Sequence, residues 1–303
     1  MSFQVTDILG DRLTIHSAGR HLLTYVYQPK TAALESPRPY FHPLTTLAGD
    51  TVTIFRPHDH RWHYGLSFVL PHVNGENFWG GVTYVHGEGY IQLDNNGRQE
   101  HAGWIDPPQA WDDFITIAQR VMWYTHDDEK WLREQRLIVL NDALMSDDYW
   151  GMALSFHLQN VSKTPLEIGS PTTQGRPKAG YGGLFWRGVR DFTGGSILLD
   201  GERAASGDQD HLMGERASWL AFVGSHDQTD RASTVILVDS VENPRHPTQW
   251  FSRATPYACA SASFQFDTPY LLEPDQTLSL SYHVFIASGA WSAARIQELV
   301  DTL

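Results

Sequence analysis

Alternation of apolar and polar residues with a period of two restricts the fold of this chain more than any other feature. Residues 153–159 and 279–286 both show it, with Leu154, Phe156 and Leu158 as the apolar positions of the first segment. Successive side chains of a strand point to opposite faces, so such segments bury one face and expose the other. Segments rich in β-branched and aromatic residues predict further strands at 3–8, 12–16, 21–27, 51–56, 64–70, 114–125, 130–140, 217–223, 233–238 and 258–266.

Helical spacing of apolar residues is convincing only near the end of the chain, at 290–302. Ser288 is the expected N-cap of this helix. Many strands and one principal helix predict an all-β fold, either a sandwich or a barrel. Of these we expect a large β-sandwich that forms a single domain over residues 1–303, with a C-terminal helix.

The charge and the lone cysteine restrict the partners and the compartment. The chain has 35 acidic and 22 basic residues and a formal net charge of -13, and such a surface repels nucleic acid. The single cysteine, Cys259, can form no internal disulfide, and its apolar neighbours predict an inert buried thiol.

The N-terminal residues do not resemble a signal peptide and no apolar run is long enough to cross a membrane, so we expect a cytoplasmic protein. This composition is compatible with a homo-oligomer.

The segment 56–65 holds the densest group of chemically reactive side chains. Its sequence is Arg-Pro-His-Asp-His-Arg-Trp-His-Tyr-Gly. Imidazole exchanges protons near neutral pH and is a common metal ligand. If the segment is extended, His58, His60 and Trp62 point to one side and His63 to the other.

Three interpretations of this segment follow from its residues. His58 and His60 could chelate a metal, although their spacing does not match the helical His-Glu-x-x-His pattern. Alternatively, an imidazole acts as acid or base without a metal, beside Arg56 or Asp59. The third interpretation is that the histidines only bond the backbone of a loop.

Three further segments carry candidate binding residues. Glu76 and Asn77 follow an Asn-Gly turn and can present a carboxylate and an amide at a pocket rim. The expected loop 170–190 combines arginines with aromatic side chains, and prolines stiffen the segment 243–250. Together with the first segment, they give as candidate substrate-binding residues Arg56, His58, Trp62, Asn77, Trp79, Arg176, Tyr181, Phe185, Trp186, Arg187, Arg190, Arg245 and His246.

Four segments of the chain resemble the DUF6807 family, which is often labelled "methane oxygenase PmoA". They are Tyr-Phe-His-Pro-Leu at 40–44, Pro-His-Asp-His-Arg-Trp-His-Tyr-Gly-Leu at 57–66, Val-Asn-Gly-Glu-Asn-Phe-Trp at 73–79 and Asn-Pro-Arg-His-Pro-Thr-Gln-Trp at 243–250. The resemblance implies a large β-sandwich similar to galactose mutarotase. It also implies a role in carbohydrate catabolism. The label evokes a membrane subunit with transmembrane helices, and this sequence predicts none.

These observations predict a carbohydrate-active enzyme of epimerase, lyase or hydrolase type, acting on a sugar or sugar acid. Acid-base chemistry on a sugar ring needs an acid and a base, and we expect His60 or His63 as the acid and Glu76 as the base. The alternative is a non-catalytic carbohydrate-binding or sensing protein, which needs no such pair. A third is a metal-dependent oxygenase with His58 and His60 as ligands, so the expected cofactor is either none or a divalent metal.

We further predict that one pocket is lined by His58, His60, His63, Arg245 and His246. Both segments are polar and contain proline, and the family resemblance includes both. A sandwich can bring such distant segments together on one concave face.

Overall fold

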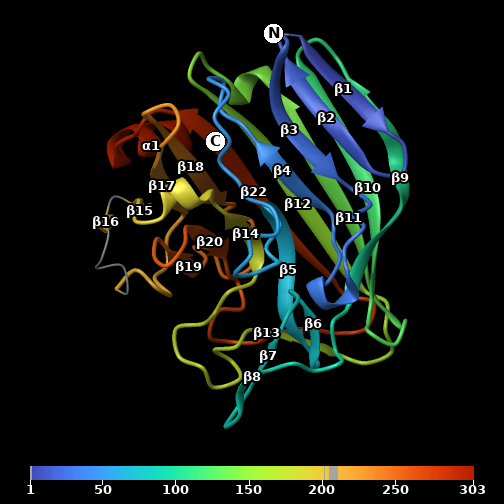
Figure 1. Cartoon of the computed structure of the whole chain (residues 1–303). Helices are drawn as coiled ribbons and strands as arrows, with labels where there is room; N and C mark the ends of the chain where they lie inside the picture. The colour runs from blue at the N-terminus through green and yellow to red at the C-terminus, as the bar shows by residue number, and fades with distance from the viewer. Residues whose placement is uncertain (1, 201, 205–210) are drawn as a thin grey trace.

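The computed structural model describes residues 2–200, 202–204 and 211–303. Most of these residues form antiparallel strands, and two large sheets pack face to face (Figure 1). The all-β sandwich expected from the alternating segments is therefore confirmed. No helix in this part of the chain is long and apolar enough to span a membrane.

One sheet contains eleven strands within the described residues. It joins strands that are far apart in sequence, most notably residues 66–73 and 183–187. Its main path runs β1 (Phe3–Ile8), β2 (Arg12–Ser17), β3 (Arg20–Val26), β4 (Tyr40–Leu44), β5 (Leu66–Val73), β14 (Gly183–Arg187), β20 (Cys259–Ala262) and β19 (Trp250–Arg253). The strands β6 (Glu76–Phe78), β13 (Leu166–Gly169) and β21 (Tyr270–Leu272) lie off this path.

The other sheet contains nine strands of the described chain. Its order is β16 (Glu202–Ala204), β15 (Ser196–Leu199), β17 (Trp219–His226), β18 (Arg231–Asp239), β22 (Thr277–Ser288), β12 (Tyr149–Asn160), β11 (Lys130–Asn141), β10 (Phe114–Tyr124) and β9 (Arg98–Ala110). A small hairpin of β7 (Thr83–Val85) and β8 (Gly89–Ile91) stands apart from both sheets. Single turns of 3-10 helix occur at Ala33–Glu35, Asp142–Leu144 and Arg190–Phe192.

Strands β12 and β22 show how alternation builds the core. They pair antiparallel, with Phe156 opposite Leu280, and both side chains are buried between the sheets. The ring of Phe156 stacks on Phe68 of the other sheet, with the ring centroids 4.5 Å apart. On the outer face, Nδ1 of His157 lies 2.9 Å from the hydroxyl of Ser279. Burial of one face and solvation of the other thus follow directly from the period of two.

The helix α1 (Ala293–Val300) packs on the outer face of the second sheet, beside β17 and β18 (Figure 1). Its N-cap is Ser292, whose hydroxyl accepts a hydrogen bond from the amide of Arg295 at 3.3 Å. The expectation that Ser288 caps this helix is therefore wrong. Ser288 still belongs to β22, because its pairing with β18 continues to that residue.

The outer face of the first sheet carries a separate apolar group around β5, β14, β20 and β19. Alternation along β14 sends Leu184 and Trp186 into the core between the sheets and Phe185 to the outer face. Arg187 shares the outer face with Phe185. The segment 170–190, expected to be a loop, thus contains a strand that is buried on both faces. This outer surface is where the candidate site lies.

Candidate functional site

Residues 56–65 form a tight loop before β5 and are not extended. The amide of His60 donates to the carbonyl of Pro57 at 3.1 Å, and the amide of His63 donates to the carbonyl of His60 at 3.0 Å. These successive turns stack the rings of His60 and His63 at an angle of 20°, with centroids 4.6 Å apart. The expectation that extended backbone sends the two side chains to opposite sides is therefore wrong, and both imidazoles share one site.

Arg187 connects the two histidines to a carboxylate. Its guanidinium is fully buried and lies 3.8 Å from the ring centroid of Tyr257. One terminal nitrogen is 2.7 Å from Nδ1 of His63, and the other donates to Oδ2 of Asp59 at 2.9 Å. The same carboxylate oxygen lies 2.8 Å from Nδ1 of His60. The four side chains therefore form a continuous polar network.

The chemistry of these partners determines where the imidazole protons lie. A guanidinium only donates, so Nδ1 of His63 accepts from Arg187 and its Nε2 carries the proton. An ionised carboxylate only accepts, so Nδ1 of His60 donates to Asp59, and Nε2 of the neutral ring keeps its lone pair. The site therefore offers a proton acceptor on His60 beside an N–H donor on His63.

Burial and charge keep both rings neutral at neutral pH. Burial lowers the pKa of His63 well below its ordinary value, and the charge of Arg187 lowers it further. Burial also lowers the pKa of His60, although the hydrogen bond to Asp59 and its charge oppose that shift. Burial alone would raise the pKa of Asp59, but hydrogen bonds from His60 and Arg187 and the charge of Arg187 lower it well below its usual range.

The two histidines form part of the wall of a pocket on the outer face of the first sheet. Its volume is about 290 Å³, close to the lower end of the ~300–1,000 Å³ range of small-molecule sites. No carboxylate of the described residues lines it. The aromatic part of the wall consists of Trp62, Trp79, Tyr181, Phe185, Phe251 and Tyr257.

Three more lining residues have ionisable side chains. Arg176 packs over the ring of Tyr90, 4.6 Å from its centroid, and donates to its hydroxyl. Arg253 is the last residue of β19, and its buried Nε has no hydrogen-bond partner in the described part of the chain. Cys259 is buried, and burial raises the pKa of its thiol to about 12, which keeps it protonated and unreactive.

Several residues selected from the sequence are brought together here. Trp62, Trp79 and Arg176 line the pocket with both histidines, and Arg187 lies directly behind them. Sequence reasoning misses Arg253 and Tyr257, because the proline-bearing segment it selects ends just before them. The signal that could have found Arg253 is the alternation along β19, which places it on the same face as the lining residue Phe251.

Trp186 does not form a platform for a sugar, which corrects the expectation from the sequence. Its side chain is fully buried, and its indole N–H donates to the carbonyl of Val52 at 3.1 Å. Its ring centroid lies 5.2 Å from that of Phe222 in the opposite sheet. A shift of one residue along a strand reverses the direction of the side chain, so Phe185 faces the pocket in its place.

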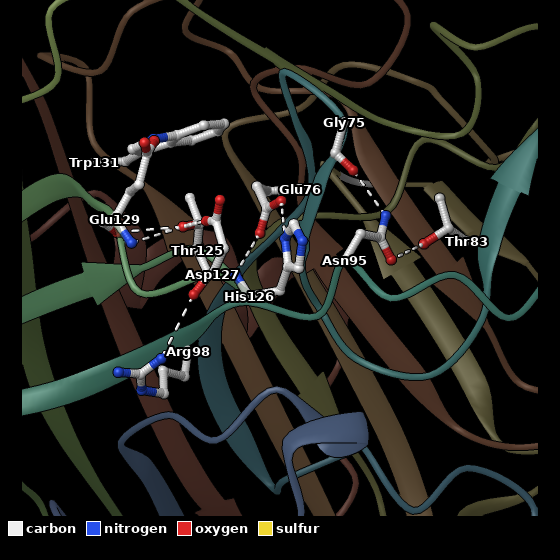
Figure 2. Close-up of polar contacts among 10 residues, drawn as sticks. All are labelled: Gly75, Glu76, Thr83, Asn95, Arg98, Thr125, His126, Asp127, Glu129 and Trp131. Carbon is white, nitrogen blue, oxygen red and sulfur yellow. Dashed lines mark hydrogen bonds and ion pairs between the residues drawn. The ribbon is translucent and has the colours of Figure 1, made fainter.

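Glu76 contacts His126 (Figure 2), and it is not among the residues that line the pocket. Its Oε1 lies 2.7 Å from Nδ1 of His126, and its Oε2 accepts from the amide of the same residue at 2.9 Å. The hydrogen bond that the His126 ring donates to this carboxylate raises the pKa of His126. The short strand β6 therefore directs Glu76 to the turn after β10, where it ties two loops together. Its expected role as the base is contradicted by this geometry.

Asn77 serves the backbone of its own loop. Its side-chain oxygen accepts from the amides of Trp79 and Gly80, both at 2.9 Å. Its nitrogen donates to the hydroxyl of Thr83 at 3.0 Å. Asn77 therefore holds Trp79 in position and does not itself line the pocket.

Arg56 and His58 are also held by other side chains and do not line the pocket. Arg56 donates to both carboxylate oxygens of Glu35, at 2.8 and 2.6 Å. Nδ1 of His58 lies 3.0 Å from a terminal nitrogen of Arg190, which also pairs with Asp59. These contacts fasten the loop 56–65, to which both residues belong, to Glu35 and Arg190 outside the pocket.

Arg245 and His246 do not join the histidine pocket, which corrects the prediction of a shared site. Arg245 donates to the carbonyls of Phe264 and Pro269 at 3.0 and 2.8 Å. Nδ1 of His246 lies 2.8 Å from Oδ2 of Asp239. These contacts use both side chains to hold the loop between β18 and β19.

The two histidines suggested as ligands if a metal is present both contact other side chains. Among residues 2–200, 202–204 and 211–303, no group of three or more histidine, cysteine, aspartate or glutamate side chains is arranged to hold a metal ion. His58 contacts Arg190, and His60 contacts Asp59. The described residues therefore do not assemble a ligand set around this pair.

The fold and the site together define a β-sandwich protein with an aromatic, histidine-bearing pocket on the outer face of one sheet. Residues 12–301 match the family described as "Family of unknown function (DUF6807)". The chain therefore belongs to the DUF6807 family, as its resemblance in four segments implied. A search of curated proteins finds no match.

Several solved structures match this chain along most of its length. One is galactose 1-epimerase from Lactobacillus acidophilus NCFM, with a TM-score of 0.37, 9% identity, and coverage of 95% of this chain and 99% of that one. Another is the α-galactosidase from Lactobacillus brevis, with a TM-score of 0.40, 9% identity, and coverage of 95% and 40%. A third is a Glycoside Hydrolase Family 97 enzyme from Pseudoalteromonas sp. strain K8, with a TM-score of 0.33, 7% identity, and coverage of 94% and 33%. The chain thus spans about a third of the family 97 enzyme, and at these scores the likeness carries no information about activity.

Proposed function

We propose that this protein is a carbohydrate-active enzyme that moves a proton on a sugar or sugar derivative, with His60 as the base. The observation that supports this most is the pairing of two neutral imidazoles with opposite roles in one pocket. His60 presents a lone pair on Nε2, and His63 presents an N–H, because Asp59 and Arg187 engage their Nδ1 atoms. A site that only binds a sugar can use this lone pair to accept a hydrogen bond, but it has no need of the carboxylate that stabilises the protonated ring.

In the proposed mechanism, Nε2 of His60 takes a proton from the sugar. Asp59 orients the ring and stabilises the imidazolium that forms, which is the role of a carboxylate behind a catalytic histidine. The N–H of His63 donates a hydrogen bond to the substrate oxygen on which negative charge develops. The two histidines thus take the roles that the sequence divides between a histidine and Glu76.

The rest of the pocket suits a sugar in shape and chemistry. Trp62 and Trp79 offer flat apolar faces on which the C–H face of a pyranose ring can stack. A volume of about 290 Å³ suits a ligand of monosaccharide size. Epimerase-, lyase- and hydrolase-like reactions all include a proton transfer that a neutral imidazole can perform.

The test is to measure turnover of a panel of neutral and oxidised sugars by the wild type and by His60→Ala and His63→Ala. We expect both variants to stay folded, with a lower melting temperature for His63→Ala because it leaves the buried Arg187 without this acceptor. We expect His60→Ala to lose about 10²- to 10⁴-fold in rate. His157→Ala is the matched control, because His157 lies on the outer face of β12 and contacts Ser279. Full turnover by His60→Ala would overturn the proposal. Sugar binding without turnover by the wild type would support the non-catalytic alternative.

A further inference from the structure

We propose that the ligand of this pocket carries a carboxylate, and that Arg253 binds that carboxylate. The substrate class is then a sugar acid and not a neutral sugar. That the ligand is a sugar rests on the proposed function. That it carries a carboxylate is argued from the charge and the hydrogen-bonding capacity of the pocket itself.

The pocket is positively charged in a protein that is strongly acidic. The chain has 35 acidic and 22 basic residues, yet two arginines and no carboxylate line the pocket within the described residues. Asp59 lies behind the histidines, where its charge is matched by Arg187 and Arg190. Arg176 and Arg253 form no ion pair with any carboxylate in the described ranges, so their charges remain available to a ligand.

Arg253 is placed to meet such a ligand next to the histidines. It ends β19, opposite Cys259 of β20, on the face that forms the pocket. It lines the pocket together with His60 and Tyr257. Its positive charge adds to burial in lowering the pKa of His60. A guanidinium binds a carboxylate through two parallel hydrogen bonds, which a hydroxyl cannot reproduce.

The buried nitrogens of the pocket wall that lack a partner are all hydrogen-bond donors. Three buried nitrogens of its wall lack a partner in the described structure: Nε1 of Trp62, Nε2 of His63 and Nε of Arg253. The first and third carry a proton by their chemistry, and Arg187 fixes the proton of the second. Buried donors without acceptors are rare because they cost free energy, so they indicate a ligand rich in acceptors. A carboxylate is an acceptor only, with about four lone-pair positions.

A bound carboxylate would also help the proposed chemistry. The charge of Arg253 lowers the basicity of His60, and a carboxylate on Arg253 cancels that effect. Binding of the correct substrate would therefore strengthen the base. A neutral sugar would leave the arginine unpaired and the base weaker.

The first experiment uses the wild-type protein and matched ligands in isothermal titration calorimetry. D-Glucuronate, D-galacturonate and D-mannuronate are each compared with the corresponding uronamide, which has the same shape but no charge. We expect at least one acid to bind roughly 10- to 100-fold more tightly than its amide, the range that a charged hydrogen-bonded pair contributes. Equal affinity of each acid and its amide, or no binding of any acid, would overturn the inference.

The second experiment compares Arg253→Gln with Arg253→Lys and the control Arg295→Gln. Arg295 is a surface arginine on α1 that pairs with Asp148. We expect Arg253→Gln to lose the preference for the acid over the amide, Arg253→Lys to keep part of it, and Arg295→Gln to keep all of it. An unchanged preference in Arg253→Gln refutes the role of that residue. If this variant fails to fold, the acid and amide comparison on the wild type still decides whether the ligand carries a carboxylate.

These outcomes separate the inference from the proposed function. Turnover that depends on His60 but shows no preference for acids leaves the enzyme proposal intact and overturns the carboxylate. Tight binding of a uronate that the wild type does not convert supports the carboxylate and overturns the enzyme.

Discussion

Arg187 determines which ring nitrogens of His60 and His63 carry a proton, although it does not itself line the pocket. By donating to Nδ1 of His63 and to Asp59, it forces one imidazole to be a donor and leaves the other a base. A lysine could not reach both acceptors in this way, because it has no planar fork. Arg187 is therefore a positioning residue for the two groups that meet the ligand.

The first prediction concerns the titration of His60. Burial lowers its pKa and the hydrogen bond and charge of Asp59 oppose that shift, so we expect half-protonation below pH 6.5 in the folded protein. Asp59→Asn removes the opposing charge, and the midpoint should then move to lower pH. Histidine NMR signals followed against pH give both values directly. A midpoint at or above pH 6.5 in the wild type would contradict the neutral base.

The second prediction is that Glu76 contributes to stability and not to catalysis. Glu76 is buried and holds the amide and ring of His126, so Glu76→Gln should lower the free energy of unfolding by about 1–3 kcal/mol. Turnover and ligand binding should remain unchanged. Urea denaturation gives the first quantity and the sugar panel the second. Loss of turnover with unchanged stability would return Glu76 to the site.

Residue types in the site could be predicted from the sequence, but their partners could not. Clustering of polar groups is enough to select His60 and His63. The sequence cannot show that Trp186 points inward and Phe185 outward, because every residue of β14 is buried. Where both faces of a strand are covered, apolar and polar residues do not alternate. The sequence then does not show which side chains point to which face of the sheet.

At the level of elements, alternation locates strands that are half exposed and overlooks the others. The segments 153–159 and 279–286 fall inside β12 and β22. By contrast, β9 contains two adjacent prolines and few apolar residues. It lies at the edge of its sheet, where proline is tolerated. Its sequence therefore carries little signal for a strand.

The third prediction concerns the cap of α1. Ser292 accepts from the amide of Arg295, so Ser292→Ala should destabilise the protein by about 0.5–2 kcal/mol. Ser288→Ala is the matched control, since Ser288 lies in β22 and does not cap the helix. Thermal or urea unfolding of both variants measures the difference. Equal effects of the two substitutions would contradict the assigned N-cap.

For the whole molecule, two packed antiparallel sheets follow from the sequence, but their strand order does not. Alternation shows that a strand has one face for a core, and it does not say which strand lies beside it. The pairing of β5 with β14 joins residues 66–73 to residues 183–187, and it brings the loop before β5 beside the lining residue Phe185. Such pairing depends on the packing of the complete chain, so the set of residues that line the pocket could not be predicted from the sequence.

The fourth prediction is a loss of stability in acid. Burial lowers the pKa of many histidines, so below pH 6.5 the unfolded chain binds more protons than the folded one. Stability should therefore be complete above pH 6.5 and fall as the pH decreases, by up to about 1.4 kcal/mol per pH unit for each fully buried ring and less for exposed ones. Urea unfolding at pH 7.5 and 5.5 measures the change, and greater stability at pH 5.5 would refute it. The histidines concerned are His21, His42, His60, His63, His72, His101, His226 and His283.

The neighbours of β5 in the first sheet also have a consequence for how the protein is made. A ribosome completes β5 long before β14, which pairs with it, has been synthesised. During that interval the edge of residues 66–69 that later pairs with β14 has no partner from this chain, and exposed edges of apolar strands recruit other chains. We therefore expect nascent chains that stop before Gly183 to aggregate or to bind chaperones. Chains that extend past Arg187 can cover that edge with their own strand.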